Sequence, residues 1–297
     1  MFILFCDSGF SHKEVDYLFA EEYEAAKEVG LSAYLISYEA LKKGDIASAL
    51  RFVKPCEHLE TAVYRGWMLK PLQYEMLYRG LLEKNLRLIN DPKEYKFCHY
   101  LPENYEVIQH YTPKTTYKAL TGPFDVAEFQ TEIEAFGKSP ILVKDYVKSQ
   151  KHYWDDACFI PDASDAEKVA SVVRRFLELQ DNDLNEGLVF REYIELEALA
   201  THSQSGMPLT KEFRVFVKAG EVMSVFKYWD EGDYGDTAPV LSRFQDLLPK
   251  IGSHFFSMDI AKQKNGDWLI VELGDGQVSG LPDNSDKTAF YRNFVKQ

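Results

Sequence analysis

The sequence predicts a mixed α/β protein, α+β overall, in which a parallel α/β lobe precedes two antiparallel-sheet lobes. In the first 90 or so residues, short apolar runs alternate with helical patterns, and this alternation is typical of a parallel sheet. From Pro140 onwards the apolar runs pair as hairpins, which indicates antiparallel sheets. The chain has 297 residues, of which 45% are hydrophobic and 14% aromatic, so it can bury a substantial core.

The first 90 residues are expected to form a small doubly wound lobe. Strands are predicted at FILFC (2–6), SAYLIS (32–37), TAVYRGW (61–67) and LRLIN (86–90), and helices over Lys13–Gly30, Tyr38–Phe52 and Leu72–Lys84. Another helix is expected directly afterwards, because Asn90 or Asp91 can cap it and Pro92 suits an early helical position.

The remaining residues combine hairpins with isolated helices. YTPKTTY (111–117) is expected to be an extended connector, because proline disfavours helix before it. The strands ILVKDYV (141–147) and ACFIPD (157–162) flank the loop Lys148–Asp156. A further strand is GLVFREYI (187–194), a hairpin is EFRVFVKAGEVMSVFKYW (212–229) with Glu212 opposite Lys227, and helices are expected at Phe124–Phe136, Asp165–Leu179, Leu241–Lys250 and Lys287–Val295.

The last hairpin, MDIAKQKNGDWLIVEL (258–273), carries an unusual acidic pair. Asn265 and Gly266 predict a two-residue turn, and counting outwards from that turn places Asp259 directly opposite Glu272. The opposite face is expected to be core and to hold Phe256, Met258, Ile260, Leu269, Val271 and Leu273. Like charges at this spacing repel, so one interpretation is that Mg²⁺ lies between them. The other is that both carboxylates point into water and are screened by salt.

Composition excludes several classes of protein. A net charge of −13 argues against a broad nucleic-acid footprint, so nucleic acid is an unfavoured partner, although a local basic groove stays open. The four scattered cysteines form no CxxC pair, which favours reduced thiols in the cytoplasm. The first apolar run stops at Asp7 without a preceding basic segment, so neither a signal peptide nor a membrane span is expected.

Common catalytic motifs are absent. In GDGQVSG (274–280) the third glycine comes one position too late for a dinucleotide fingerprint, and no phosphate-binding P-loop occurs. The sequence has neither a GxSxG nor an HExxH motif. The seven histidines do not cluster, so each is expected to be an ordinary surface or core residue.

Charged residues interrupt several otherwise apolar strands. Lys144, Arg191 and Arg214 lie in three separate strands, and Asp259 and Glu272 lie in the last hairpin. One such interruption usually marks a position that faces solvent. Three basic and two acidic interruptions in one half of the chain fit a polyphosphate and a metal ion held between two sheets.

These strand residues, in this order, resemble the ATP-grasp superfamily. The segments YRGWML, LINDPKEY, VKDYVKSQKHYW, EFRVFV and VELGDGQVSGL are similar to a divergent clade of bacterial and phage members, related to the eukaryotic cell-division-cycle protein that assists assembly of translation initiation factor two. The resemblance implies an ATP-grasp fold that grips ATP between two antiparallel lobes. It divides the chain into a pre-ATP-grasp lobe (1–90) and an ATP-grasp domain (91–297), with a small lobe at about 115–190 and a large lobe at about 191–297.

The resemblance also implies roles for individual residues, with ATP and Mg²⁺ as cofactors. Lys144, Arg214 and Arg191 are the expected catalytic cations. The expected ATP contacts are Lys96, Lys144, Lys148 and Arg214 at the phosphates, Glu192 and Ile194 at the adenine, and Glu197 at the ribose. Asp259 and Glu272 are the expected magnesium ligands.

Two features depart from the family pattern. Gly274 stands where the family usually has an asparagine ligand, so a second metal would depend on Asp275 or on water. The loop KSQKHYWDD (148–156) is basic and aromatic where the family loop is glycine-rich. Lys148, Lys151 and His152 either reach the phosphates or belong to a solvated loop, and both interpretations stay open.

The function implied is an ATP- and Mg-dependent carboxylate–amine ligase that forms an acyl phosphate and releases ADP, with a peptide or protein as one candidate substrate. Its substrate face would include Arg65, Gln277 and Ser279, although Arg65 also suits an ion pair at a junction between lobes. Two alternatives remain: an ATP-binding assembly protein without turnover, and an ATP-dependent enzyme acting on RNA ends.

Overall fold

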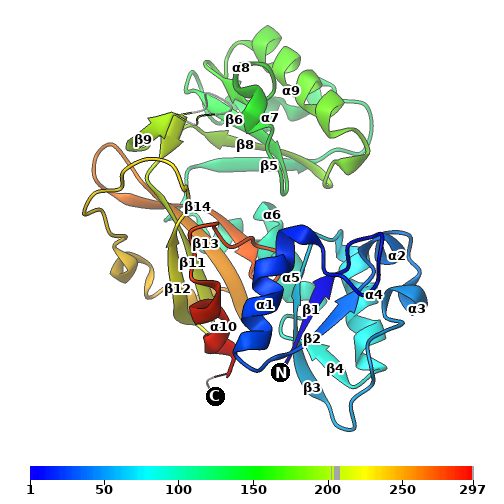
Figure 1. Ribbon diagram of the computed structural model, residues 1–297. Coiled ribbons are helices and arrows are strands. Elements are labelled where there is room, and N and C mark those ends of the chain that lie inside the picture. The colour runs from blue at the N-terminus through cyan, green and yellow to red at the C-terminus, as the bar shows by residue number, and fades with distance from the viewer. Residues whose placement is uncertain (202, 204–207, 296–297) are drawn as a thin grey trace.

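The computed structural model describes residues 1–201, 203 and 208–295. A parallel sheet with its helices forms one part, a small antiparallel lobe lies apart from it, and a second antiparallel sheet lies between them (Figure 1). This arrangement confirms the predicted mixed α/β class and the ATP-grasp fold. The division at residues 90 and 91 stays a prediction. No helix in the described part of the chain is long and apolar enough to cross a membrane.

The N-terminal sheet is parallel and has the strand order β2-β1-β3-β4. Its strands are β1 (Phe2–Cys6), β2 (Ser32–Ile36), β3 (Glu60–Arg65) and β4 (Leu86–Leu88), and its helices are η1 (Tyr17–Phe19), α1 (Ala20–Glu28), α2 (Tyr38–Lys42), α3 (Ile46–Ala49) and α4 (Pro71–Leu82). Strand residues alternate between two cores, because successive side chains point to opposite faces. Leu4 and Tyr64 belong to one core, whereas Ile3 and Val63 belong to the other.

Two helices connect this sheet to the rest of the chain, α5 (Pro92–His99) and α6 (Leu101–Ile108). Asp91 caps α5 as expected, since its side chain accepts hydrogen bonds from the backbone of Lys93 and Glu94. The capping box is completed by Glu94, whose side chain accepts from the Asp91 backbone. α5 packs against the end of the C-terminal sheet and so lies beside the predicted acidic pair.

The small lobe has an antiparallel sheet of order β5-β8-β6-β7, covered by helices on one side (Figure 1). Its strands are β5 (Thr115–Ala119), β6 (Ile141–Asp145), β7 (Phe159–Ile160) and β8 (Gly187–Glu192), and its helices are η2 (Val126–Phe129), α7 (Gln130–Glu134), η3 (Lys151–Tyr153), α8 (Trp154–Ala157), α9 (Ala166–Gln180) and η4 (Asp181–Asp183). α9 buries Val169, Val173 and Phe176 against this sheet.

The C-terminal sheet is antiparallel and has the order β12-β11-β13-β14. Its strands are β11 (Glu212–Lys218), β12 (Glu221–Lys227), β13 (Phe255–Lys262) and β14 (Trp268–Asp275), and the pair β9 (Ala198–Thr201) and β10 (Pro208–Thr210) lies beside it. α10 (Lys287–Val295) packs against α1 near both chain ends (Figure 1). The helix expected at Leu241–Lys250 is instead two 3-10 turns, η5 (Leu241–Phe244) and η6 (Leu248–Lys250), because Pro249 cannot donate a helical hydrogen bond.

The last hairpin confirms the pairing of Asp259 with Glu272 but corrects the route to it. The loop has three residues, since Gln263 N bonds to Asp267 O and Gly266, with φ of 93°, follows a tight turn. The register then shifts between Asp259 and Ile260, so that a bulge at Val271 restores the predicted pair. The two displacements cancel beyond the bulge. Within it, Trp268 and Ile270 face the core in place of the predicted Leu269 and Val271.

The preceding hairpin also contains a bulge. Ala219 and Gly220 form its turn as predicted, both with positive φ. The register shifts between Phe216 and Val217, so Lys227 pairs with Phe213, and Tyr228 N bonds to Glu212 O. The predicted pairing of Glu212 with Lys227 was therefore wrong by one residue.

Candidate active site

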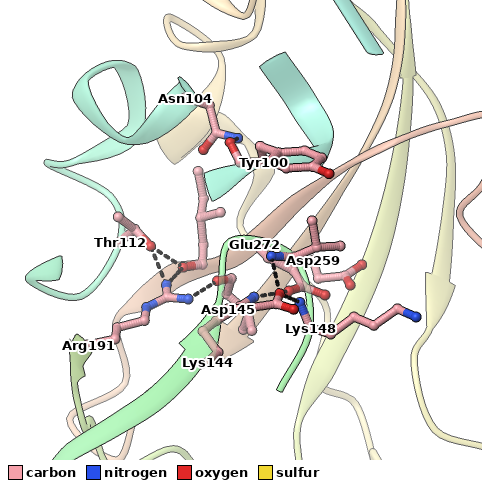
Figure 2. Close-up of polar contacts among 12 residues, drawn as sticks. Tyr100, Asn104, Thr112, Lys144, Asp145, Lys148, Arg191, Asp259 and Glu272 are labelled. Atoms are coloured by element: carbon pink, nitrogen blue, oxygen red, sulfur yellow. Dashed lines mark hydrogen bonds and ion pairs between the residues drawn. The ribbon is translucent and has the colours of Figure 1, made fainter. Parts of the chain in front are cut away.

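Two ion pairs lie where the small lobe faces the C-terminal sheet. Arg214 on β11 binds Asp259 on β13 through two parallel hydrogen bonds of 2.8 and 2.7 Å. Lys144 on β6 contacts Glu272 on β14, with Nζ 3.3 Å from Oε2. Lys144, Asp259 and Glu272 converge in Figure 2 although they come from different sheets and strands.

Strand pairing brings three of these residues into one row. Arg214 pairs with Asp259 across β11 and β13, and Asp259 pairs with Glu272 across β13 and β14. Side chains of directly paired residues share a face of the sheet, so the row presents one cation and two acids to the small lobe. Lys144 approaches from that lobe. Each carboxylate thus has its own cation, which offsets the repulsion that the sequence assigned to a metal ion.

The two carboxylates differ in burial. The Asp259 side chain is 4% exposed, whereas the Glu272 side chain is 42% exposed. Burial, opposed by Arg214, raises the pKa of Asp259. For Glu272, burial is outweighed by the nearby Lys144, Lys151 and Arg214, and its pKa is lowered. Glu272 is therefore the more accessible charged oxygen donor of the pair.

Arg191 on β8 holds the bulge of β14. It donates to the carbonyls of Val271 and Ile270 and to Thr112, which in turn donates to Ile270 O (Figure 2). Its guanidinium is buried without an acidic partner, and this burial lowers its pKa to about 10. The contact explains why the bulge lies directly before Glu272. Its Nε has no hydrogen-bond partner and belongs to a side chain that lines a cavity.

A cavity of about 410 Å³ extends from the ion pairs towards the small lobe. Lys144, Arg191, Asp259 and Glu272 line it, together with mostly apolar side chains such as Leu142, Val143, Trp154, Leu209 and Leu269. The predicted hinge residues Glu192 and Ile194 also line it. The backbone N–H of Ile194 makes no hydrogen bond within the described part of the chain.

A second cavity of about 80 Å³ lies on the side of the ion pairs that faces the N-terminal lobe. Lys144, Arg214, Asp259 and Glu272 line this cavity as well. Its other walls include His99, Met68, Leu101, Val278 and the predicted Ser279. The charged row therefore lies between the two cavities and borders both.

Three predicted nucleotide contacts lie outside the walls of both cavities. Lys96 forms ion pairs with Glu103 at 3.2 Å and Glu186 at 3.1 Å. The carboxylate of Glu197 binds Lys211 and Lys262, while Glu195 lines the large cavity.

Lys148 is the third of these predicted contacts. Its backbone N–H bonds to Asp145, and its side chain extends away from Lys144 and Glu272 (Figure 2).

Two of the predicted substrate contacts are buried in the junction between lobes. Arg65 is 1% exposed, binds both carboxylate oxygens of Glu22, and donates to the carbonyls of Gly276 and Ser279. Gln277 is fully buried and its side chain bonds to the backbone of Tyr64. The junction interpretation therefore describes Arg65, and of this group Ser279 alone lines a cavity.

The two carboxylates fit a magnesium ion bound jointly with phosphates. No group of three or more His, Cys, Asp or Glu side chains within residues 1–201, 203 and 208–295 is placed to hold a metal. Mg²⁺ often takes only one or two carboxylates and completes its shell with phosphate oxygens and water. Asp259 and Glu272 match that pattern.

The position of the family's third metal ligand is filled in another way. A Cβ atom on Gly274 would lie 2.7 Å from both Ser257 Oγ and Ser279 Oγ, which bond to each other at 2.6 Å. An asparagine therefore has no room there. Asp275 points elsewhere, since its carboxylate binds Asn90 and Gln277 and lines neither cavity.

Several cavity residues lacked a strong sequence signal. Lys151 from the loop lies over the ring of Trp229 at 5.0 Å and that of Tyr228 at 5.8 Å, and all three residues line the large cavity. Glu212 lines the same cavity, and burial raises its pKa. The aromatic pair directly after the strand, beside a basic and aromatic loop, is the signal that would have indicated this contact.

The arrangement of lobes and the charged row define an ATP-grasp protein. Residues 132–294 match the model of an ATP-grasp domain family, described as family 3 of its clade. The match covers more than half of the chain, and the chain belongs to this family. A comparison with curated proteins found no match.

Solved structures of similar fold cover the whole chain. D-cycloserine synthetase DcsG aligns with a TM-score of 0.60 at 16% identity, over 100% of this chain and 99% of that chain. D-alanine–D-alanine ligase from Bacillus anthracis, complexed with ATP, gives 0.60 at 10% identity, over 100% and 96%. ATP-grasp ligase PsnB, complexed with minimal precursor, Mg and ADP, gives 0.53 at 12% identity, over 99% and 97%. These likenesses show a shared fold.

Proposed function

We propose that this protein is an ATP- and Mg-dependent carboxylate–amine ligase that forms an acyl phosphate and releases ADP. The observation that carries the proposal is the shared row of Lys144, Arg214, Asp259 and Glu272 between a large and a small cavity. Such a row suits phosphoryl transfer from a nucleotide on one side to a small acceptor on the other.

ATP is assigned to the large cavity. Its apolar walls suit a purine, and the unbonded N–H of Ile194 at its rim suits an adenine nitrogen. Arg191 faces this cavity with an unpaired buried Nε, which suits an anionic oxygen. Lys151 can exchange its aromatic contacts for a phosphate, because it already lines the same space.

The chemistry follows from charge placement. A carboxylate oxygen attacks the γ-phosphorus, the bond to ADP breaks, and negative charge spreads over the phosphoryl oxygens. Lys144 and Arg214 offset that charge from fixed positions, and magnesium held by Asp259 and Glu272 would neutralise the phosphates. An amine nitrogen then bonds to the acyl carbon, and phosphate leaves with the electron pair of the carbon–oxygen bond.

The structural neighbours support this class of reaction. They include a D-cycloserine synthetase, a D-alanine–D-alanine ligase and a ligase solved with a precursor, Mg and ADP. The link to the eukaryotic assembly protein is not shown by these comparisons. An assembly role without turnover and an action on RNA ends are therefore outcomes of the test below.

The test is to incubate the protein with ATP, Mg²⁺ and separate pools of carboxylates and amines, and to measure ADP, AMP and phosphate. Release of ADP and phosphate that requires both pools supports the ligase. AMP release indicates adenylyl transfer, and tight ATP binding without product indicates an assembly role; either overturns the proposal. Glu178→Gln is a suitable control variant, because its exposed pair with Arg175 lies on α9.

A further inference from the structure

The small cavity contains a buried histidine without a hydrogen-bond partner. His99, the last residue of α5, is 8% exposed and lines this cavity. Its ring packs between those of Tyr95, at 5.1 Å, and Tyr100, at 5.8 Å. Neither ring nitrogen makes a hydrogen bond to any residue that the structure describes. Ring packing therefore holds the imidazole while its nitrogens stay unused.

An unpartnered buried imidazole calls for an explanation, because buried polar groups are nearly always hydrogen-bonded. Burial lowers the pKa of His99 to about 4; Glu272 opposes this effect, whereas Lys144 and Lys148 add to it. The ring is therefore neutral near pH 7, with one nitrogen that donates and one that accepts. A neutral acceptor suits an N–H group better than it suits an anion.

The rest of the cavity wall explains where such a group would lie. Lys144 and Arg214 line the same cavity and suit the carboxylate or acyl phosphate. His99 is absent from the walls of the large cavity, so it does not belong to the proposed nucleotide site. With about 80 Å³ of space and the apolar neighbours Met68 and Leu101, only the reacting ends of two substrates fit.

We propose that His99 binds the neutral amine substrate and acts as its general base, which assigns the nucleophile's place within the proposed ligase reaction. The amine nitrogen forms its bond to the acyl carbon and becomes acidic as it does so. One N–H proton passes to the free nitrogen of His99, the carbon–oxygen bond to phosphate breaks, and phosphate leaves with the electron pair. His99 then returns its proton to the departing phosphate, so that amide and hydrogen phosphate are the products.

Two nucleophiles of similar size separate this role from a structural one. Hydroxylamine is a much weaker base than methylamine, so its adduct loses a proton to water without help. His99→Gln keeps a hydrogen-bonding side chain but cannot take up the proton. With the carboxylate that supports ADP release, His99→Gln should slow methylamine ligation on the order of 10²-fold and leave hydroxamate formation unchanged. His110→Gln, at an exposed position, is the matched control and should change neither rate.

Equal loss with both nucleophiles, or no loss with methylamine, would overturn the assignment. If the wild-type protein uses ATP with no carboxylate, the ligase proposal fails first, and binding alone then decides the role of His99. In that case, NMR of ¹⁵N-histidine-labelled protein is followed during a methylamine titration. A saturable shift of the His99 ring signals, assigned through His99→Gln, supports the site, and unchanged signals reject it.

Discussion

The protein contains two kinds of buried ion pair, and they differ in what surrounds them. Arg65 and Glu22 lie at the junction between the N-terminal lobe and the C-terminal helix, where Arg65 also binds three backbone carbonyls and Tyr291 binds Glu22. Arg214 and Asp259 form an equally good bidentate pair, but two cavities border it. Geometry within the pair does not distinguish them.

The difference lies in unused bonding capacity. Every donor nitrogen of Arg65 is engaged within the protein, so the pair can only stabilise the fold. Around Arg214, the carboxylates keep lone pairs directed at open space, and His99 and Arg191 keep unbonded nitrogens. A buried charge thus indicates a functional site when it borders a cavity and retains capacity for a ligand. Each prediction below tests one side of this distinction.

The largest effect is expected at the junction. Arg65→Met should lower the free energy of unfolding by about 3–5 kcal/mol, because it leaves the Glu22 carboxylate buried without its cation. Urea unfolding measures this change. The double variant with Glu22→Leu should recover much of the loss, since an apolar pair can replace a buried ion pair. Full stability in Arg65→Met would contradict a structural role and revive the substrate-clamp interpretation.

The next effect concerns the charged row. Glu272→Gln should reduce ATP use by roughly 10²–10³-fold while changing stability little, because its side chain is 42% exposed and has one ion-pair partner. Asp259→Asn is less informative, since it would also break a buried bidentate pair. The measurements are ADP release and urea unfolding of the same preparation. Retained ATP use with lost stability would place Glu272 among the structural residues.

A smaller effect is expected from pH. Burial raises the pKa of Asp275 to about 7 from an ordinary value of 3.8. Between these values the unfolded chain loses the proton that the native state keeps, so stability falls as pH rises. The fall from pH 5 to pH 7 should be about 2 kcal/mol. It is measured as the difference between the wild-type and Asp275→Asn curves, and parallel curves would disprove the shift.

The sequence predicted the fold and the strand charges well, because both depend on local pattern. Alternating strands and helices indicated the parallel lobe, and Lys144, Arg191, Arg214, Asp259 and Glu272 all line the large cavity or carry a partner that does. The hairpin bulge was not predictable locally. It depends on Arg191, which contacts Val271 across 80 positions of sequence.

His99 was missed for a related reason. A single histidine in a helix has no periodic signal of its own, and its importance comes from the cavity that several separate segments enclose. Tyr95 and His99 are four residues apart and share one helical face, which predicts their contact but not the free ring nitrogens. Such unused capacity becomes visible only with the tertiary structure.

The smallest effect is expected at Lys96, which the family resemblance assigned to the phosphates. In the structure Lys96 forms ion pairs with Glu103 and Glu186, is about one-third exposed, and lines neither cavity. Lys96→Ala should therefore change stability by less than about 1 kcal/mol and leave the affinity for ATP unaltered. Calorimetric titration with ATP and Mg²⁺ provides the test. A tenfold or larger loss of affinity would mean that Lys96 leaves both glutamates when nucleotide binds, and that an exposed ion pair can also hold a ligand contact in reserve.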